Sequence, residues 1–192
     1  MKRRLRAVAH ALLGDYQLFH IFRMEPRVDG DAAPPAGGPW RFGRVHDMGE
    51  LSLATARSIR AFAESTWDGC YAFAAWAGDT LAGLAFFKSR QGYEGGRPLW
   101  PLGPGEAELV QLTTEETYRG RGLAPLLIRW SSAQMARLGF PGIYAKVWHN
   151  YQSSLRAFRK ADWRRVAFLV ELYPFGTGKR IRLVFPRRRL RT

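Results

Sequence analysis

A chain of 192 residues with 46% hydrophobic and 14% aromatic residues can bury a sizeable core in one domain and is too apolar for an intrinsically disordered protein. Its 30 lysines and arginines against 16 acidic residues give a formal net charge of +14, which favours anionic partners such as phosphates, nucleic acid, anionic lipid or an acidic protein. One cysteine excludes an intramolecular disulfide, and the four histidines lack metal-ligand spacing, so we expect a cytoplasmic protein without a metal.

The first residues predict a basic N-terminal helix over 1–15. The segment begins like a secretory signal peptide, but its apolar stretch is short, contains His10 and lacks a small-x-small cleavage site. Val8 and Leu12 share a helical face that could lie on an anionic membrane surface; we prefer packing on the domain through that face. No run approaches the length of a membrane span, and residues 187–192 predict a frayed basic tail.

Beyond this helix, the pattern of apolar residues predicts a mixture of strands and helices. In chain order we expect a strand over 16–22, a Gly/Pro-rich loop over 29–45, a helix over 48–64, a hairpin over 69–89 turning at Gly78-Asp79, a second Gly/Pro-rich loop over 89–105, a strand over 106–114, a helix over 123–138, a strand over 142–149, a short helix over 151–161, and strands over 164–173 and 179–185. This order indicates an α/β or α+β fold, a sheet with helices on its faces, in a single domain spanning 1–192.

The most informative stretch is Tyr-Arg-Gly-Arg-Gly-Leu-Ala at 118–124, which follows an expected strand and opens an expected helix. The first turn of a helix leaves backbone N–H groups unpaired, and the helix dipole adds partial positive charge. Gly120 and Gly122 let the backbone turn sharply and approach a ligand closely, while Arg119 and Arg121 add forked cationic donors. The stretch therefore predicts a site for two linked phosphates.

Two other nucleotide-binding motifs are excluded by the residues present. The phosphate-binding loop of nucleotide hydrolases needs Gly-x4-Gly-Lys-Ser/Thr, which the chain lacks. A dinucleotide-binding fold needs a third glycine and an acidic residue about twenty positions further on, and residues 139–145 offer no acid. Pro125 has no N–H, so the donors to an anion must lie at or before Ala124.

With these residues in view, the segment from Glu106 to Trp163 resembles the core of the GCN5-related N-acetyltransferase (GNAT) family. The family motif Arg/Gln-x-x-Gly-x-Gly/Ala is matched at every fixed position. The resemblance implies a mixed, mostly antiparallel sheet flanked by helices, in which the fourth and fifth strands, here 106–114 and 142–149, splay apart to admit the arm of acetyl-CoA. The implied cofactor-binding residues are Leu112, Thr113 and Thr114 for the pantetheine arm, and Arg119, Gly120, Arg121, Gly122, Leu123 and Ala124 for the diphosphate.

Residues 150–163 resemble a further helix of the family. Its pattern is Asn-x-x-Ala/Ser, then an aromatic residue, then a lysine, and then Gly-Phe. The resemblance implies that Asn150 and Ser153 or Ser154 contact the pantetheine or phosphate side. The chain departs from the pattern in three places: the spacing from asparagine to the aromatic residue is one longer, Asp162-Trp163 replaces Gly-Phe, and Phe158 replaces the tyrosine that protonates the departing thiolate.

A phenyl ring cannot donate a proton, so Phe158 cannot serve as the general acid. Either Tyr151 or Tyr173 takes that role, or water does, or the chain is catalytically impaired. Amide formation also needs a base, because an alkylamine is mostly protonated at neutral pH. The resemblance places a catalytic carboxylate at Glu108; Glu106 is the second choice, since strand alternation puts both on one face. The alternative is that both are ordinary surface charges.

Other residues are candidates for the acceptor side. A backbone N–H near Thr113 or Thr114 would polarise the thioester carbonyl. Six loop residues could reach or shape an acceptor pocket, although the aromatic ones could equally pack under the loops: His46, Asp68, Glu94, Trp40, Tyr93 and Trp100. Cys70 lies among apolar neighbours, which favours core packing over a nucleophile.

The function expected is transfer of an acetyl group from acetyl-CoA, or of another acyl group from its CoA ester, to a primary amine of a small molecule or protein by direct attack, without a metal. Ten basic residues against one acid, Asp162, between Arg119 and Arg165 would also suit docking of an acidic acyl carrier protein as donor. The competing hypothesis is a non-catalytic module that binds nucleic acid or an anionic membrane. Nucleic acid is the less favoured partner because no stacking motif or helix-turn-helix is evident. The chain is expected to be a monomer or a homodimer.

Overall fold

The computed structural model describes residues 15–25, 38–47, 49–52, 60, 68–93, 98, 100–174 and 180–186. The basic helix expected over 1–15, apart from Asp15, and the tail expected over 187–192 lie outside the described residues, as does Glu94. Of the helix expected over 48–64, residues Gly49–Ser52 form the short helix α2 and Arg60 is helical, while the rest lies outside them.

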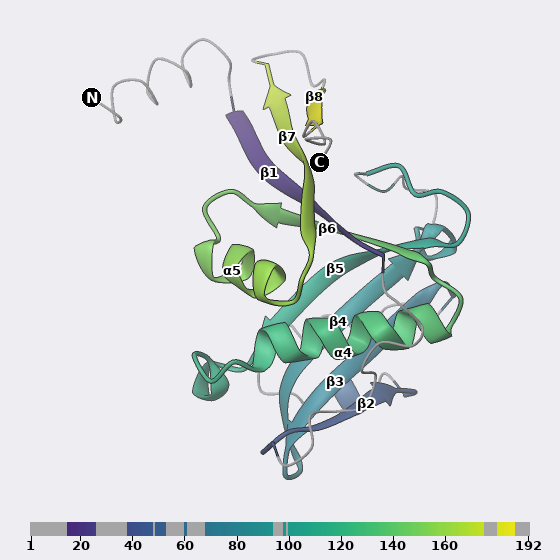
Figure 1. Cartoon of the computed structure of the whole chain (residues 1–192), viewed down its shortest axis with the longest axis vertical. Coiled ribbons are helices and arrows are strands. Elements are labelled where there is room, and N and C mark those ends of the chain that lie inside the picture. The colour runs from purple at the N-terminus through teal and green to yellow at the C-terminus, as the bar shows by residue number, and fades with distance from the viewer. Residues whose placement is uncertain are drawn as a thin grey trace, which may run out of the picture.

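The strands are β1 (Asp15–Met24), β2 (Arg41–Val45), β3 (Cys70–Ala77), β4 (Thr80–Ser89), β5 (Glu106–Thr114), β6 (Gly142–Trp148), β7 (Arg164–Tyr173) and β8 (Ile181–Pro186). The longer helices are α4 (Leu123–Arg137) and α5 (Gln152–Lys160), with 3-10 turns η1 (Arg90–Gly92) and η2 (Glu116–Tyr118). Figure 1 shows how these elements are arranged. Within the described ranges, no helix is long and apolar enough to cross a membrane.

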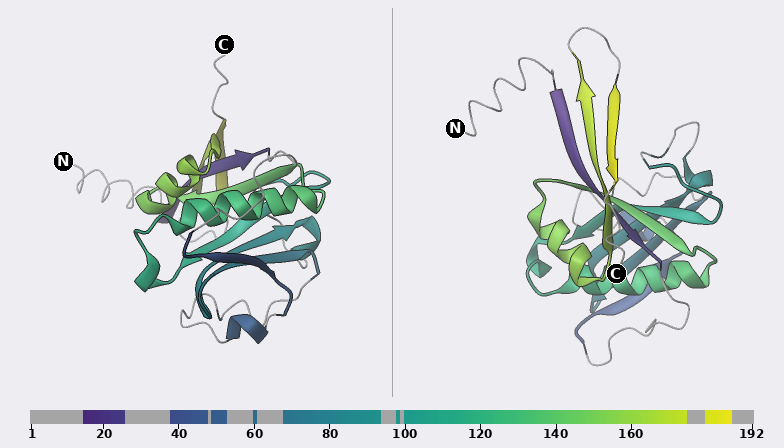
Figure 2. Two further views of the ribbon diagram at one scale, coloured as in Figure 1. Left: turned by 60° about the horizontal axis from the view of Figure 1, so that its bottom comes forward. Right: turned by 45° about the horizontal axis from the view of Figure 1, so that its top comes forward.

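One eight-stranded sheet runs in the order β2-β3-β4-β5-β6-β1-β7-β8. Only β5 and β6 pair in parallel; the other neighbours pair antiparallel. In Figure 2, α4 lies across one face of this sheet. The expected fold class, a mostly antiparallel mixed sheet flanked by helices, is therefore confirmed.

The prediction of a loop over 29–45 is wrong at its end, because Arg41–Val45 forms the edge strand β2. This strand pairs antiparallel with β3, from Arg41 opposite Trp76 to Val45 opposite Ala72. Gly43 lies against the Trp76 ring, where a Cβ atom would come within 3.0 Å of it, so the absent side chain lets β2 pass close to the tryptophan. The pairing partner lies some thirty residues away, and five residues of pattern are too few to reveal it.

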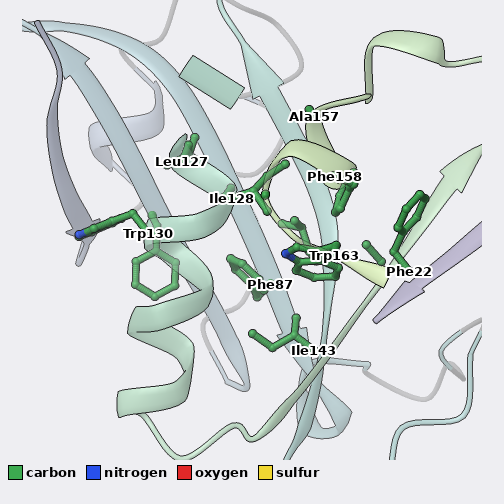
Figure 3. Packing of buried hydrophobic residues seen from close by; sticks show 14 of the residues in the cluster. Phe22, Phe87, Leu127, Ile128, Trp130, Ile143, Ala157, Phe158 and Trp163 are labelled. Carbon is green, nitrogen blue, oxygen red and sulfur yellow. The ribbon is translucent and has the colours of Figure 1, made fainter. Parts of the chain in front are cut away.

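The main hydrophobic core fills the space between the sheet and the two helices (Figure 3). Helix α4 contributes Leu127, Ile128 and Trp130, and the sheet contributes Phe87 and Ile143. Burying each large apolar side chain stabilises the fold by about 1.5–3 kcal/mol, so this cluster fixes α4 firmly on the sheet. Two smaller clusters lie on the opposite face of the sheet, one around Phe86 and Cys70, the other around Phe19 and Tyr144.

Both ends of α4 are defined by glycines with positive φ. At its end, Gly139 adopts φ 91°, and the N–H groups of Gly139 and Phe140 donate to the carbonyls of Ala136 (3.0 Å) and Met135 (3.1 Å). These two hydrogen bonds satisfy carbonyls that the helix would otherwise leave unpaired, and they end the helix. At its beginning, Gly122 has φ 78° and no side chain caps the first turn.

The parallel pair β5 and β6 is joined over only four residue pairs, from Glu106 opposite Gly142 to Leu109 opposite Ala145. Beyond these pairs β5 continues to Thr114 along β4, and β6 continues to Trp148 along β1. The two strands therefore separate after Leu109 and Ala145, as Figure 1 shows beside α5. The expected splay is confirmed, and the space between the separated strands is called the gap below.

Candidate active site

The stretch 119–122, called here the glycine loop, joins η2 to α4. Gly120 and Gly122 both have φ 78°, a conformation that other residues adopt only under strain. A Cβ atom at either position would meet nothing within 4 Å, so open space lies in front of both. Because no side chain caps α4 at Gly122, the N–H groups of its first turn remain available to an anion.

The two arginines of the glycine loop have different surroundings. Arg119 bonds back to the end of β5: its Nε donates to the Thr114 carbonyl at 3.2 Å and its Nη1 to Glu116 Oε1 at 3.1 Å. The Arg121 guanidinium lies over the Tyr118 ring, 5.7 Å from its centroid, and makes no ion pair with any described residue. Arg119 thus positions the loop, and Arg121 is the loop cation that an anionic ligand would meet.

Leu112, Thr113 and Thr114 lie on β5 beyond its separation from β6, and all three are partly exposed. On one side this part of β5 pairs with β4, where Thr114 lies opposite Gly83 and Thr113 opposite Leu84. On the other side it faces the gap, where β6 offers no pairing. Main-chain groups directed to that side can therefore bond an extended ligand as a strand would.

The register of β5 against β4 shifts at Val110, because Phe87 lies opposite Leu109 whereas Phe86 lies opposite Gln111. Such a bulge adds a residue to one strand and re-aims the side chains around it. It falls where β5 leaves β6, and Gln111 Nε2 then donates to Thr113 Oγ1 at 2.8 Å. The bulge thus marks the inner end of the gap.

Glu108 lies on β5 one residue before the last pair with β6 and is 4% exposed. Its Oε2 accepts a hydrogen bond from the Tyr93 hydroxyl. Burial raises the pKa of the Glu108 carboxyl above its usual value, while the Tyr93 hydrogen bond and the charge of Lys146 oppose that rise. Burial, followed by the neighbouring carboxylate, raises the pKa of Tyr93. A buried carboxylate with a raised pKa suits proton abstraction.

Glu106 is held by several donors instead. It accepts hydrogen bonds from the Gly103 N–H (2.8 Å) and the Tyr144 hydroxyl (3.3 Å), and pairs with Arg23 at 3.5 Å. These contacts fix the start of β5 to β1 and β6. Neither Glu106 nor Glu108 is an exposed surface charge, but only Glu108 combines deep burial with a place next to the gap.

Residues at the start of α5 lie at the far end of β6. Asn150 and Ser153 are exposed and Ser154 is half-buried. Tyr151 is 55% exposed, with its ring 6.4 Å from that of Trp148. In Figures 1 and 2 the starts of α4 and α5 lie on the same side of the molecule, where β5 and β6 have separated. The structure thus brings these residues to the same end as the glycine loop.

Tyr173 is not brought to this place. It ends β7 opposite Asp15, whereas β6 ends at Trp148 opposite Phe19. The offset of four positions from Phe19 to Asp15 carries Tyr173 about 13 Å beyond the end of β6, on the extension of β1, β7 and β8 seen in Figure 2. Its hydroxyl donates to Glu171 at 3.4 Å.

Phe158 belongs to the core. Its ring stacks on Phe22 at 5.4 Å and meets the Trp163 ring edge-on at 5.0 Å (Figure 3). Phe158 and Trp163 are each 3% exposed, so these two residues, at two of the three departures from the helix pattern, serve packing.

The expected acceptor-side residues divide into three groups. His46 and Asp68 line a cavity of about 320 Å³ together with Cys70. Tyr93 bonds Glu108, and Trp100 packs in the cluster around Phe19 and Tyr144, with its ring centroid 5.6 Å from that of Tyr144. Trp40 lies elsewhere, buried in the main core beside Tyr118. The Tyr93–Glu108 pair was not anticipated from the sequence, because no spacing rule connects a loop tyrosine to a strand carboxylate.

The ten basic residues from Arg119 to Arg165, called here the basic block, lie on the glycine loop, α4, β6, α5 and the start of β7. Of its ten residues between Arg119 and Arg165, only Lys146 is half-buried and nine are exposed, on the glycine loop, α4, α5 and the start of β7. Near them, His20 bonds His149 at 3.0 Å and Arg165 at 3.3 Å. Burial, then the Arg165 charge, lowers the pKa of His20 to about 4, so His20 is neutral at pH 7.

With this geometry in place, comparison with known proteins gives the family. The model of the acetyltransferase (GNAT) family matches residues 42–163, which include all but the first residue of β2, β3 to β6, the glycine loop, α4 and α5. The chain belongs to this family.

Solved structures agree with the fold. The chain is similar to a GNAT-family protein from Novosphingobium aromaticivorans (21% identity, TM-score 0.53, covering 83% of this chain and 64% of that one). It is also similar to a GCN5-related N-acetyltransferase from Sphaerobacter thermophilus (12% identity, TM-score 0.54, covering 93% of this chain and 59% of that one). A tandem GNAT protein from the clavulanic acid biosynthesis pathway is similar too (11% identity, TM-score 0.53, covering 88% of this chain and 58% of that one). The chain thus spans less than two thirds of the length of each. A search of curated protein sequences finds no match.

Proposed function

We propose that the protein is an N-acyltransferase that moves an acetyl group from acetyl-CoA to a primary amine of a small molecule or protein. The observation that carries the proposal is the uncapped, glycine-led start of α4 at the outer end of the gap between β5 and β6. The start of α4 offers an anion site, which matches the diphosphate of the donor. The adjoining gap offers an extended slot, which matches the donor's pantetheine arm.

In this proposal the N–H groups from Arg119 to Ala124 hold the diphosphate, with Arg121 adding charge. Main-chain groups of Leu112 to Thr114 bond the pantetheine arm, and Asn150 with Ser153 or Ser154 contacts it from α5. The bulge at Val110 sets the inner end of the slot, so the thioester lies near Glu108. Because Thr113 and Thr114 lie about 10–13 Å along β5 from Val110, a main-chain N–H at the bulge, rather than one near these threonines, polarises the thioester carbonyl as negative charge develops on its oxygen.

Glu108 acts as the general base in this proposal. Its carboxylate removes a proton from the ammonium group, directly or through water, and the free amine attacks the carbonyl carbon. The C–N bond forms first and gives a tetrahedral intermediate. As this intermediate collapses, the C–S bond breaks, the nitrogen releases its second proton to water, and the leaving sulfur takes up a proton. Tyr151 is the proposed donor of that proton, relayed by water along the gap from its outer end, because Phe158 is buried in the core and Tyr173 is far from the gap.

The direct test measures donor binding and turnover in parallel. We expect acetyl-CoA and desulfo-CoA, the analogue without the sulfur, to raise the Tm by several degrees at concentrations about 100-fold above Kd, since a ligand that binds only the folded state stabilises it by about 2.7 kcal/mol there. Thiol release from acetyl-CoA should depend on an added amine. No Tm shift at saturating ligand, with salt-sensitive nucleic-acid or vesicle binding instead, would favour a non-catalytic module.

Replacing the proposed proton donor gives a narrower prediction. Tyr151→Phe should lower kcat by about 10-fold or more while leaving Kd for desulfo-CoA unchanged, because the hydroxyl is needed only as the C–S bond breaks. Tyr173→Phe removes a tyrosine hydroxyl on the far extension and serves as the matched control, with unchanged kcat. Equal rates for the Tyr151 variant and the wild type would assign the proton to water.

A further inference from the structure

Two lysines lie beside Glu108 on the face of the sheet that points away from α4. Ala107 and Leu109 belong to the main core beneath α4, so strand alternation places Glu108 on the opposite face. Lys88 of β4 lies directly opposite Glu108 in the antiparallel ladder and shares this face, with the two Cβ atoms about 4.5–5.5 Å apart. The second lysine, Lys146, comes from β6 on the other side of β5.

Lys146 reaches this face at the edge of the gap. In the parallel ladder Tyr144 lies opposite Glu108, and Lys146 follows two positions later, so both β6 side chains point to the same face as Glu108. Lys146 is also the first residue of β6 beyond the last pair, Leu109 with Ala145, so it borders the inner end of the gap. Its charge acts on Glu108, where it opposes the rise in pKa that burial causes.

Aromatic rings, and not acids, hold the two lysine side chains. The Lys146 ammonium lies 4.6 Å from the centroid of the Phe19 ring, within the range of a cation–π contact, and Trp148 packs on that ring at 4.5 Å. Lys88 lies over the Tyr93 ring in the same way, at 5.8 Å. Both lysines are half-buried, and neither forms an ion pair with a described residue. Each ammonium group therefore keeps N–H donors for an anionic ligand.

These charges bear on which amines can approach Glu108. An acceptor ammonium that enters beside Lys88 and Lys146 adds a third positive charge around one carboxylate. Arg23 and Glu106 pair with each other at 3.5 Å and so leave this balance unchanged. The repulsion disfavours simple amines and diamines. An acceptor that carries its own carboxylate or phosphate offsets it and gains charge-assisted hydrogen bonds from the lysines.

We infer that the acceptor of the proposed reaction is a small amine that carries an anionic group, which Lys146 and Lys88 bind while Glu108 takes the amine proton. The inference rests on the proposed function and deepens it by naming the class of acceptor. The Cα atoms of Glu108 and Lys146 are about 8 Å apart by strand geometry, one strand spacing across and two residues along. An amine only a few atoms from a carboxylate or phosphate can bridge their side chains.

The test compares pairs of amines whose members differ in the anionic group. The pairs are β-alanine with β-alaninamide and phosphoethanolamine with ethanolamine, and cadaverine represents the diamines. Thiol release from acetyl-CoA gives kcat/KM for each amine. We expect wild type to prefer the anionic member of at least one pair by about 10-fold or more, since hydrogen bonds to charged groups contribute a factor of roughly that size. The preferred pair tells whether the anion is a carboxylate or a phosphate.

Equal rates within both pairs, or a faster reaction with cadaverine, would overturn the inference and leave the proposed function standing. Lys146→Gln, once thermal melting shows that it is folded, should lose the preference through a higher KM for the anionic amine, with little change in kcat. Lys160→Gln makes the same change at an exposed lysine at the end of α5 and should keep the preference. A Lys146 variant that keeps the preference, or that slows both members of a pair equally, also contradicts the inference.

Should Lys146→Gln not fold, the wild-type comparison alone decides. Should no amine be turned over, the Tm of the protein saturated with desulfo-CoA is measured with each amine. The anionic amines should raise this Tm in wild type and not in Lys146→Gln, because only a bound ligand stabilises the folded state. Equal Tm values for all amines would overturn the inference. If desulfo-CoA itself does not bind, the proposed function falls and the inference falls with it.

Discussion

Gly122→Glu should reduce the affinity for desulfo-CoA by at least about 100-fold. The new side chain begins where a Cβ atom meets nothing within 4 Å, in the open space before the first turn of α4, and places a carboxylate where the donor's diphosphate is proposed to bind. Two like charges then compete for the same N–H groups. Isothermal titration with desulfo-CoA measures the loss.

The structure offers a matched control for this change in Gly139→Glu. Gly139 ends the same helix, also has positive φ, and also faces open space. Both variants force a side chain into a left-handed conformation, which costs about 1–2 kcal/mol and lowers the Tm by about 2–8 °C. Only Gly122→Glu should lose donor binding. If both variants bind as wild type does, the glycine loop is not the diphosphate site.

Glu108→Gln should lower kcat by about 100- to 1,000-fold with little change in Kd for desulfo-CoA, because the amide keeps the shape of the carboxyl but cannot accept the proton. Glu106→Gln is the control on the same strand. It loses the charge that pairs with Arg23, so the Tm should fall while kcat changes little. A large kcat loss in the Glu106 variant alone would move the base role to Glu106.

The pH dependence of the rate tests the same assignment. Only the ionised form of Glu108 can act as a base, so kcat/KM should fall as pH drops through the raised pKa of this carboxyl. The Tyr93 hydrogen bond favours the carboxylate, and Tyr93→Phe removes it. In that variant the pKa of Glu108 should rise further, and the acidic limb of the profile should move to higher pH. An unmoved limb would show that another group titrates.

Elements with strong local patterns were predicted well from the sequence. The bounds expected for β5, 106–114, and β7, 164–173, agree with the structure, and the helix expected over 123–138 differs from α4 by one residue. The glycine loop was also recognised, because its glycines and arginines lie within a few positions of each other. These features depend on residues close together in the chain, which a sequence displays directly.

Features that depend on register between distant strands were not predicted. Tyr173 was a candidate proton donor until its pairing with Asp15 placed it beyond the end of β6. The hydrogen bond between Tyr93 and Glu108 requires the loop after β4 to return over β5, which no local spacing reveals. Likewise, the buried place of Phe158 against Phe22 depends on how α5 packs on β1.

The short pairing between β5 and β6 divides the sheet into two blocks, β2-β3-β4-β5 and β6-β1-β7-β8. Main-chain pairing joins the two blocks over only four residue pairs. Cohesion between the blocks therefore comes mainly from the apolar layer beneath α4 and α5, which includes side chains of both. A molecule bound in the gap and hydrogen-bonded to β5 would add contacts between the two blocks. Ligand binding should therefore reduce the motion of one block relative to the other, so that donor binding and the rigidity of the sheet are linked at the β5–β6 pairing.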